Sequence, residues 1–330
     1  MSSTPISNRA AWRSVLLRLA RSRPVRLLWS VAFFVGAAYL IYRQIAAMLL
    51  SALVHAVATT NPIAVVGSIS LTCASYLCLS GSEWLALKAL GHRLGYWRAA
   101  RVAVPAYALT NSAGFSPATG TALRIQLYSP MGLSAFQSTQ VAMLAGAAVT
   151  ISGVVAAGAV IILDPSIGRA LRQSSHVVPL VGGLMIAPVA LWFVAFKSGA
   201  PAWLGGGKAE RLPTRDRVLG LGAGLGDWTF SAAALFLLLP HPDPATFAGY
   251  FVAYTAGCIL SAATGVPGGI GVFEAIVLSL TSVISKTHET AAALLLYRCI
   301  YSLGPLALAA AFGGIRRVAG SRRRAGTDAC

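Results

Sequence analysis

The sequence has few charged side chains and very few acidic ones. Only 11% of its 330 residues are charged, with 26 Lys and Arg against nine Asp and Glu, and 56% are hydrophobic. Soluble domains carry about 25% charged residues. Three stretches, 56–82, 133–163 and 244–273, hold no charged side chain, and such runs are typical of transmembrane helices. The composition therefore argues against a soluble α/β enzyme and predicts an all-α, polytopic integral membrane helical bundle.

Several motifs of enzymes and metal sites are also missing. The sequence contains no GxxxxGK[ST] phosphate loop, so ATP hydrolysis within this chain is not expected. Its five cysteines form no CxxC pair and no metal-ligand spacing, and four of them lie in apolar segments, where cysteine acts as a packing residue. We accordingly expect no metal, no cofactor and no enzymatic activity.

The net charge of +17 is concentrated at the two ends of the chain and in a few loops. The segment 1–26 holds six arginines and no acid, and 316–330 holds five arginines. Beside transmembrane helices, such clusters indicate cytoplasmic orientation and contact with anionic lipid head groups rather than nucleic acid. We therefore divide the chain into a basic cytoplasmic arm (1–26), a transmembrane domain (27–315) and a basic cytoplasmic tail (316–330).

About eight segments have the length and apolarity of membrane spans. They are 27–47, 61–87, 135–163, 176–197, 217–239, 244–263, 266–285 and 289–313. The basic loops near 88–101 and 197–217 should be cytoplasmic, as should both termini, while the HPDP turn at 241–244 should be outside. The segment 103–128 is interrupted by Pro and Gly. We expect it to be re-entrant or partly unwound, and whether it crosses fully stays open.

Four charged residues are predicted to lie deep in the membrane. Arg298 is nine residues past the preceding acid, and Asp227 is ten past the preceding arginine, so both lie roughly 13–15 Å into a ~30 Å core. Glu274 and Arg124 each follow a break rich in glycine and proline, whereas Glu83 could reach the interface. A charge at the bilayer centre costs about 2.5–3.5 kcal/mol. Two interpretations stay open: internal salt bridges that fix helix register, or residues that line a polar path.

The stretch ATGVPGGIGVFEA, 263–275, is the main interruption. It contains Gly265, Pro267, Gly268, Gly269 and Gly271. Proline cannot continue a helix from before it, and glycine permits positive φ. Unwound backbone at membrane depth is tolerated only where it is buried in protein or lines a wet cavity. We expect a hinge or loop here, followed by a helix with Glu274 in its first turn. A capped tight turn between two spans is the alternative.

A second segment of similar composition, 107–133, lies in the other half of the chain and contains Arg124. Two broken segments in corresponding halves of a membrane protein point to a transport site. We therefore interpret both breaks as parts of one such site.

These two segments resemble the membrane domain of lysylphosphatidylglycerol synthase/flippase proteins, and the related stand-alone bacterial membrane proteins without a synthase domain. The first part of the pattern is Tyr107, Asn111, Gly120, Arg124, Gly132 and Leu133. The second part is PGGIGVFEA from Pro267 to Ala275, followed by an alanine-rich helix with Arg298 and then Pro305. The resemblance covers about 30–315.

The resemblance implies a multi-span protein of the bacterial inner membrane that moves lipids between leaflets. In the best-known members the lipid is an aminoacylated phosphatidylglycerol, whereas stand-alone members are associated with varied lipids. We do not expect synthesis of the lipid here, because the aminoacyl-transferring domain is not present. The predicted substrate-binding residues are Tyr107, Asn111, Arg124, Asp227, Glu274 and Arg298. The arginines would meet a phosphate, and the two acids would meet an amine on the head group or balance the arginines.

The expected ligand is thus a membrane phospholipid or modified lipid. Two other interpretations stay open. The chain could be a membrane subunit or enzyme component of lipid or glycolipid biosynthesis, hopanoids included, with a partner protein. It could also be a structural protein, because the glycine series LGLGAGLG, 219–226, permits close helix contact. We expect this series to serve internal packing more than formation of a homo-oligomer.

Overall fold

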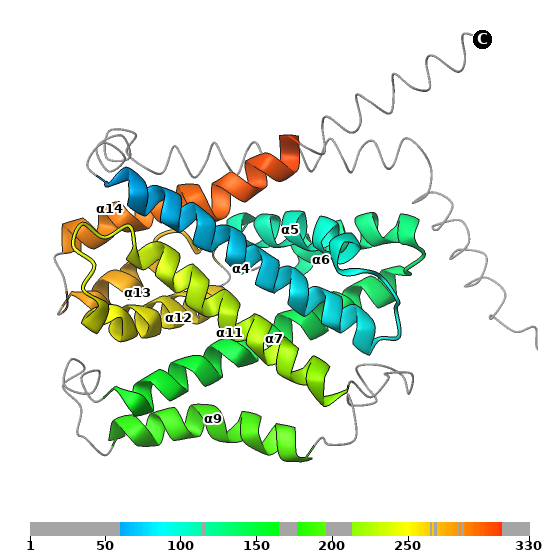
Figure 1. The fold of residues 1–330 in the computed structure, drawn as a ribbon, viewed down its shortest axis with the longest axis horizontal. Helices are drawn as coiled ribbons and strands as arrows, with labels where there is room; N and C mark the ends of the chain where they lie inside the picture. Colours follow the sequence, from blue (N-terminus) through cyan, green and yellow to red (C-terminus); the bar gives the residue numbers. More distant parts are fainter. Residues whose placement is uncertain are drawn as a thin grey trace, which may run out of the picture.

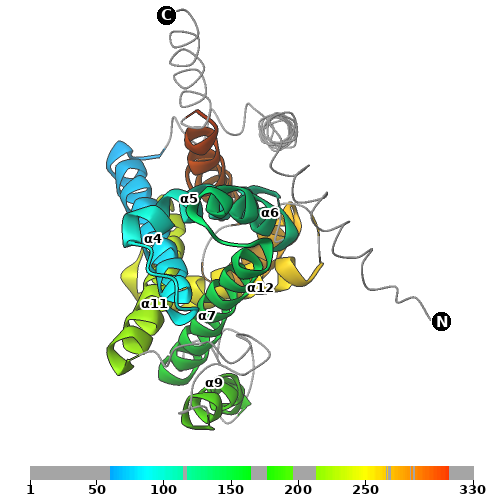
Figure 2. The same cartoon turned by 90° about the vertical axis from the view of Figure 1, so that its right-hand side faces the viewer.

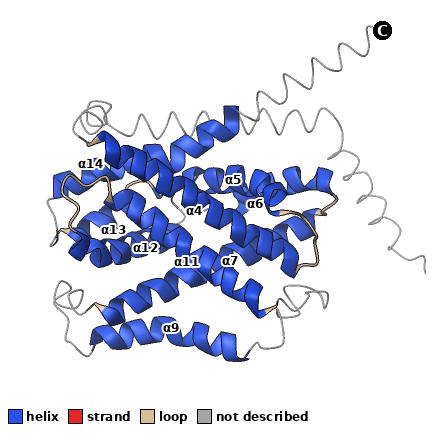
Figure 3. Cartoon of the chain, viewed as in Figure 1, coloured by secondary structure: helices blue, strands red, loops and turns tan. Residues whose placement is uncertain are grey.

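The fold of the chain is helical throughout the part that can be described. The computed structural model describes residues 60–113, 117–164, 177–195, 213–264, 266, 269–282, 284 and 287–311 (Figure 1). Within these ranges the regular elements are helices and no strand occurs (Figure 3). The predicted all-α class is therefore confirmed. The predicted span 27–47 and both basic termini lie outside the described residues.

Long apolar helices form the frame of the protein. They are α4 (Pro62–Ala89), α7 (Ala135–Leu163), α9 (Val177–Ala195) and α11 (Thr214–Phe236). A last helix runs from 287 to 311 and comprises α14 (Thr287–Tyr297), the π-helical η4 (Arg298–Leu303) and one further helical stretch. Local sequence sets where they begin: Asn61 Oδ1 accepts a hydrogen bond of 2.9 Å from Ile63 N, and Pro62 occupies the first helical position, where its missing N–H costs nothing.

Five segments of the described chain are long and apolar enough to cross a membrane. They are Pro62–Ala89, Ala135–Leu163, Thr214–Phe236, Pro244–Thr264 and Glu289–Ala311. The predicted number of about eight spans is thus not confirmed. The predicted span 176–197 corresponds to α9, which has 19 residues.

Two helical hairpins fill the space between the long helices. The first joins α5 (Tyr96–Ala113) to α6 (Pro117–Tyr128), and the second joins α12 (Phe247–Thr264) to α13 (Val272–Thr281). The 12 residues of α6 and the 10 of α13 reach only about 18 and 15 Å at 1.5 Å per residue. Since the hydrocarbon core is ~30 Å thick, neither helix alone is long enough to cross it, and the predicted full span at 266–285 is not confirmed. The segment 103–128 comprises parts of two helices, as expected for a broken element.

The two hairpins enter from opposite ends of the molecule. Lys88 Nζ lies 2.5 Å from Asp216 Oδ2, which puts the end of α4, and hence the start of α5, beside the start of α11. At the other end, a Cβ on Gly67 would lie 3.0 Å from Leu237 Cδ1, so the start of α4 lies beside the end of α11, where the chain turns into α12. Figure 1 shows α5 and α6 on the right and α12 and α13 on the left of the antiparallel pair α4 and α11. Paired broken elements of this kind occur at the substrate sites of transporters.

Basic residues of one described loop and of the adjoining helix ends gather where α5 begins. They are Lys88, Arg93, Arg98, Arg101, Arg215 and Arg217. The HPDP turn at 241–244 follows the opposite end of α11. The described basic residues and the turn thus lie at opposite ends of α11, as the predicted separation of the loops requires.

Small residues let the long helices approach one another. A Cβ on Gly224 would lie 2.2 Å from Ser152 Oγ, and one on Gly226 would lie 2.9 Å from Cys78 Sγ. Two glycines of the 219–226 series thus pack against α7 and α4 within the chain, while a Cβ on Gly222 would meet nothing within 4 Å. Internal packing accounts for this part of the series.

We expect Gly153→Ala to destabilise the protein, because α7 and α11 are in contact at this glycine. A Cβ here would lie 2.2 Å from the indole of Trp228, and Trp228 Nε1 donates a hydrogen bond of 2.8 Å to the carbonyl of Val149. The indole must shift, and such overpacking costs about 1–3 kcal/mol. Thermal unfolding in detergent micelles measures the effect.

Gly222→Ala is the matched control, since it makes the same change within α11 where the added Cβ has open space. Replacing glycine by alanine at an unstrained position raises stability by about 0.4–1 kcal/mol. The two substitutions should therefore shift the unfolding temperature in opposite directions. A Gly153→Ala variant as stable as Gly222→Ala would contradict the contact.

Candidate functional site

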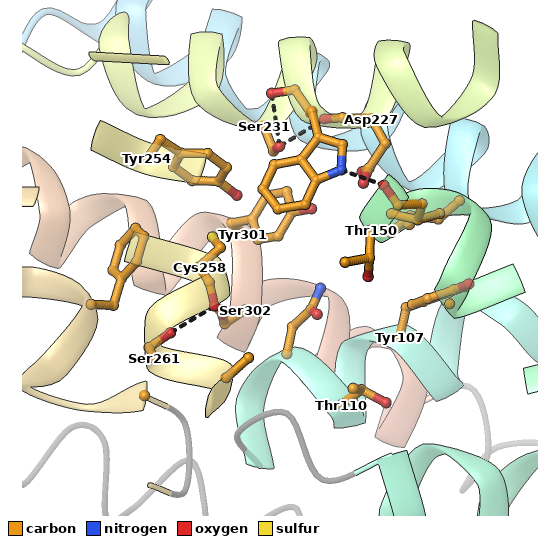
Figure 4. A pocket seen from close by; sticks show the side chains of 18 of the residues that line it. Tyr107, Thr110, Thr150, Asp227, Ser231, Tyr254, Cys258, Ser261, Tyr301 and Ser302 are labelled. Carbon is orange, nitrogen blue, oxygen red and sulfur yellow. Dashed lines mark hydrogen bonds between the residues drawn. The ribbon is translucent and has the colours of Figure 1, made fainter. Parts of the chain in front are cut away.

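A cavity of about 510 Å³ is lined by residues of both hairpins. Asn111 and Thr121 flank the first break, Ser261 and Gly269 flank the second, and all four residues line the cavity. Figure 4 shows side chains from α5, α7, α11, α12 and the last helix directed into it. Its volume lies within the range of small-molecule sites, about 300–1,000 Å³. The cavity is therefore large enough for a lipid head group.

Arg124 is fixed at one side of the cavity by a buried carboxylate. Its Nε donates to both oxygens of Glu83 at 2.9 and 3.0 Å, and its Nη2 donates to Oε2 at 2.7 Å. Tyr128 OH donates to Glu83 Oε1 at 3.0 Å, and the guanidinium lies 4.5 Å from the centre of the Tyr107 ring. Glu83 is 0% exposed, so the expectation that it reaches the interface is wrong. Its neutralisation by the two-pronged guanidinium explains its burial.

Gly120 allows the first hairpin to close tightly enough for this pair to form. A Cβ at this position would lie 2.1 Å from Thr110 Oγ1 and 3.0 Å from Arg124 Nη1. The absence of a side chain thus brings α5 against α6. This glycine belongs to the sequence pattern that pointed to the site, and its role is close packing.

Arg298 occupies the corresponding position at the second hairpin tip. Its Nε donates to Glu274 Oε1, and its Nη2 donates to the carbonyl of Gly269 at 3.2 Å. The other oxygen of Glu274 accepts a hydrogen bond of 2.9 Å from Gly271 N. Glu274 therefore caps α13 and binds Arg298 at the same time. Its side chain is 21% exposed, so this pair is more accessible than the one at Glu83.

The glycines of the second break have the backbone conformations that glycine favours. Gly269 has φ of +55° and Gly271 has φ of +84°, a region that other residues rarely adopt. This fits the predicted loop at 263–275. Gly265, Pro267 and Gly268, which were also predicted to form the hinge, lie outside the described residues.

Asp227 differs from the other deep acid in its partners. The Ser75 hydroxyl donates to Asp227 Oδ1 at 2.5 Å, and Ser75 Oγ lies 2.9 Å from Tyr301 OH. Asp227 is buried and lines the cavity. Among the described residues, no Lys, Arg or His forms an ion pair with it. Of the two interpretations left open, internal salt bridges therefore describe Arg298 with Glu274, while Arg124 pairs with Glu83 and Asp227 has no such pair within the described ranges.

Aromatic side chains surround the same part of the cavity. Trp228, Tyr254, Tyr297 and Tyr301 all line it. The Tyr254 and Tyr297 hydroxyls lie 2.7 Å apart, and the Tyr297 and Tyr301 rings stack with centroids 5.0 Å apart. Aromatic faces beside a carboxylate suit a cationic group. The sequence offered no signal for these residues, because aromatic side chains in apolar helices are ordinarily packing residues.

Five of the six predicted substrate-binding residues line the cavity, and the sixth, Glu274, binds one of them. The five are Tyr107, Asn111, Arg124, Asp227 and Arg298. Asn111 Nδ2 donates to Tyr76 OH at 3.5 Å. Tyr107 OH is buried and has no hydrogen-bond partner within the described ranges. Because buried polar groups are almost always hydrogen-bonded, this hydroxyl is available to a ligand or to water.

The π-helical turn η4 carries part of the site. It begins at Arg298 and includes Tyr301 and Ser302, all of which line the cavity. Such π turns occur frequently at functional sites. Within the described residues, no group of three or more His, Cys, Asp or Glu is arranged to hold a metal ion.

Comparisons with known proteins agree with the membrane character of this site. The chain is 28% identical over 262 residues to the inner membrane protein YbhN of Escherichia coli, a match that covers 76% of this chain and 79% of YbhN. It is 27% identical over 242 residues to uncharacterized protein slr0712 of Synechocystis, covering 73% and 75% of the two chains. No protein-family model matches. These relatives and the apolar helices identify an integral membrane protein.

Proposed function

We propose that the protein is a flippase of the bacterial inner membrane that moves a polar-headed lipid between leaflets. One observation carries the proposal: a cavity between two hairpin tips collects two arginines and an acid without a basic partner in the described chain. Ionisable groups inside membrane segments mark substrate pathways. The resemblance to the lysylphosphatidylglycerol synthase/flippase family and the similarity to an inner membrane protein support it.

The two arginine pairs suit different tasks with a phosphate-bearing lipid. Arg298 shares its guanidinium with the partly exposed Glu274, so a lipid phosphate can compete for its donors. Arg124 is held by a fully buried carboxylate through three hydrogen bonds, so it contributes a fixed positive wall. Guanidinium groups match phosphate oxygens with two parallel hydrogen bonds.

The head group we infer also carries an amine. Asp227 supplies a carboxylate whose contacts in the described chain are hydroxyl groups, and Trp228 and Tyr301 add aromatic faces. A cation between a carboxylate and aromatic rings is favoured by both charge and quadrupole. An aminoacylated phosphatidylglycerol has both groups in one molecule.

Asp227→Asn should slow translocation of an amine-bearing lipid at least tenfold, which corresponds to the loss of one charged hydrogen bond of about 1.5–3 kcal/mol. Asparagine keeps the shape and can still accept from Ser75. The measurement uses proteoliposomes, a labelled lysylphosphatidylglycerol and a quencher that reaches one leaflet only. Labelled phosphatidylglycerol, which has no amine, is the control substrate and should be affected less.

Equal movement of the amine-bearing lipid by wild type and Asp227→Asn would contradict the assigned role. If wild type moves no lipid but purified protein forms a product from a lipid donor, the alternative holds: a component of lipid or glycolipid biosynthesis.

A further inference from the structure

One wall of the cavity is also part of the outer surface of the protein. Met143, Gly146, Ala147 and Thr150 of α7 line the cavity. Met143 is 54% exposed, and Ala147 and Thr150 are exposed as well. The opposite wall, with Asp227, is buried. The cavity is therefore closed on the side of α11 and open on the side of α7.

Neighbouring helices cover α7 on both sides of this stretch. Near its start, Val141 packs in one cluster with Tyr128, the last residue of α6. Near its end, Ile161 packs against Ala248 and Val252 of α12. Figure 2 shows α7 running past α6 and α12. The exposed residues Met143, Ala147 and Thr150 lie between these two contacts, so the opening is bounded by the two hairpins.

The opening lies at the depth of the hydrocarbon core. Met143 and Thr150 are eight and fifteen residues past Ala135, where α7 begins, which places them roughly 12 and 22 Å along the helix. The whole helix has 29 residues and is thus about 43 Å long. The opening therefore occupies the middle of the helix, away from both membrane surfaces.

The chemistry changes across the cavity. At the opening, the side chains are small or apolar, and a Cβ on Gly146 would meet nothing within 4 Å. At the inner wall lie Asp227, Arg124 and Arg298. A hydrocarbon chain loses nothing by lying in the opening, since it exchanges one apolar environment for another, whereas a polar solute arriving there would first have to cross lipid.

We propose that this opening is a lateral portal that takes the acyl chains of the lipid while its head group lies in the cavity. The inference rests on the proposed function and adds the form of the ligand: a lipid that enters from the bilayer, not a solute that enters from water. The chains then stay in the membrane throughout movement, and only the head group passes the hairpin tips.

The test fills the portal. Gly146→Leu places a branched side chain in the opening. Gly222→Leu is the matched control, because Gly222 is exposed on α11, has equally open space and does not line the cavity. The probes are dioleoyl lysylphosphatidylglycerol with a diazirine on one acyl chain and its deacylated, water-soluble head group. Translocation in proteoliposomes, photolabelling mapped by mass spectrometry and calorimetric binding of the head group are measured.

In wild type, we expect the diazirine to label residues 143–150 more strongly than the other lipid-facing residues of α7. Gly146→Leu should lower both this labelling and translocation at least tenfold, while head-group binding changes less than twofold. Gly222→Leu should match wild type in all three measurements.

Two results overturn the portal while leaving the proposed function in place: translocation by Gly146→Leu at the wild-type rate, or wild-type labelling spread evenly over lipid-facing residues. A disulfide between two copies of Ala147→Cys formed in the membrane would also overturn it, since a second copy would then cover the opening. If wild type neither binds the head group nor moves the lipid, the proposed function itself fails.

Discussion

Arg298→Ala should reduce lipid translocation about 100-fold, the largest functional effect we expect from a single substitution. Alanine removes the donors to Glu274 and to the carbonyl of Gly269, and with them a guanidinium at the cavity wall. Hydrogen bonds to charged groups contribute about 1.5–3 kcal/mol, and about 2.7 kcal/mol corresponds to a factor of 100 in rate. The proteoliposome assay measures it, with the amount of reconstituted protein as reference.

Two further variants separate a structural role of Arg298 from contact with the lipid. Arg298→Lys keeps the charge and loses the planar fork, so it should retain only part of the activity. In the double variant Arg298→Ala/Glu274→Ala no unpaired charge remains. If Arg298 serves only to hold the hairpin tip, the double variant should regain activity relative to Arg298→Ala. If Arg298 contacts the phosphate, as we expect, the double variant stays inactive.

The sequence could predict the positions of the site residues because those positions depend on local geometry. The rise of a helix predicts from a count of residues alone that Arg298 and Asp227 lie deep in the membrane, and both residues line the cavity. The capping role of Glu274 follows from its place in the first turn after a glycine. For the same reason, the sequence indicated the loop at 263–275 and the break within 103–128.

The partners of these residues depend on tertiary structure, which the sequence pattern does not encode. Arg124 and Glu83 are 41 residues apart in the chain, and nothing in the spacing distinguishes Glu83 from an acid that reaches the interface. The predicted number of crossings is not confirmed for a related reason. An apolar segment after a turn has the same composition whether it crosses the membrane or folds back as a short helix, so the sequence of 266–285 does not distinguish a span from the ten-residue α13.

Replacing Glu83 by glutamine should destabilise the protein by about 3–5 kcal/mol, the cost of removing one partner of a buried ion pair. The Arg124 side chain is 5% exposed and that of Glu83 is 0% exposed, so water cannot replace the lost carboxylate as a partner of Arg124. The Tyr128 hydroxyl also loses its charged acceptor. Unfolding by increasing SDS fraction in mixed micelles measures the difference in free energy. A loss below about 1 kcal/mol, typical of surface pairs, would contradict the buried pairing.

The double variant Glu83→Leu/Arg124→Met distinguishes stability from function at this pair. Hydrophobic residues of similar volume often replace a buried ion pair without loss of stability, so the double variant should be more stable than Glu83→Gln. If Arg124 acts only within the fold, lipid translocation should recover together with stability. Arg124 is buried and lines the cavity, so its guanidinium is placed to contact the lipid. We therefore expect translocation by the double variant to stay at least tenfold below wild type. A stable but inactive double variant would thus assign the guanidinium to the lipid path, while the carboxylate serves to keep that guanidinium inside the membrane.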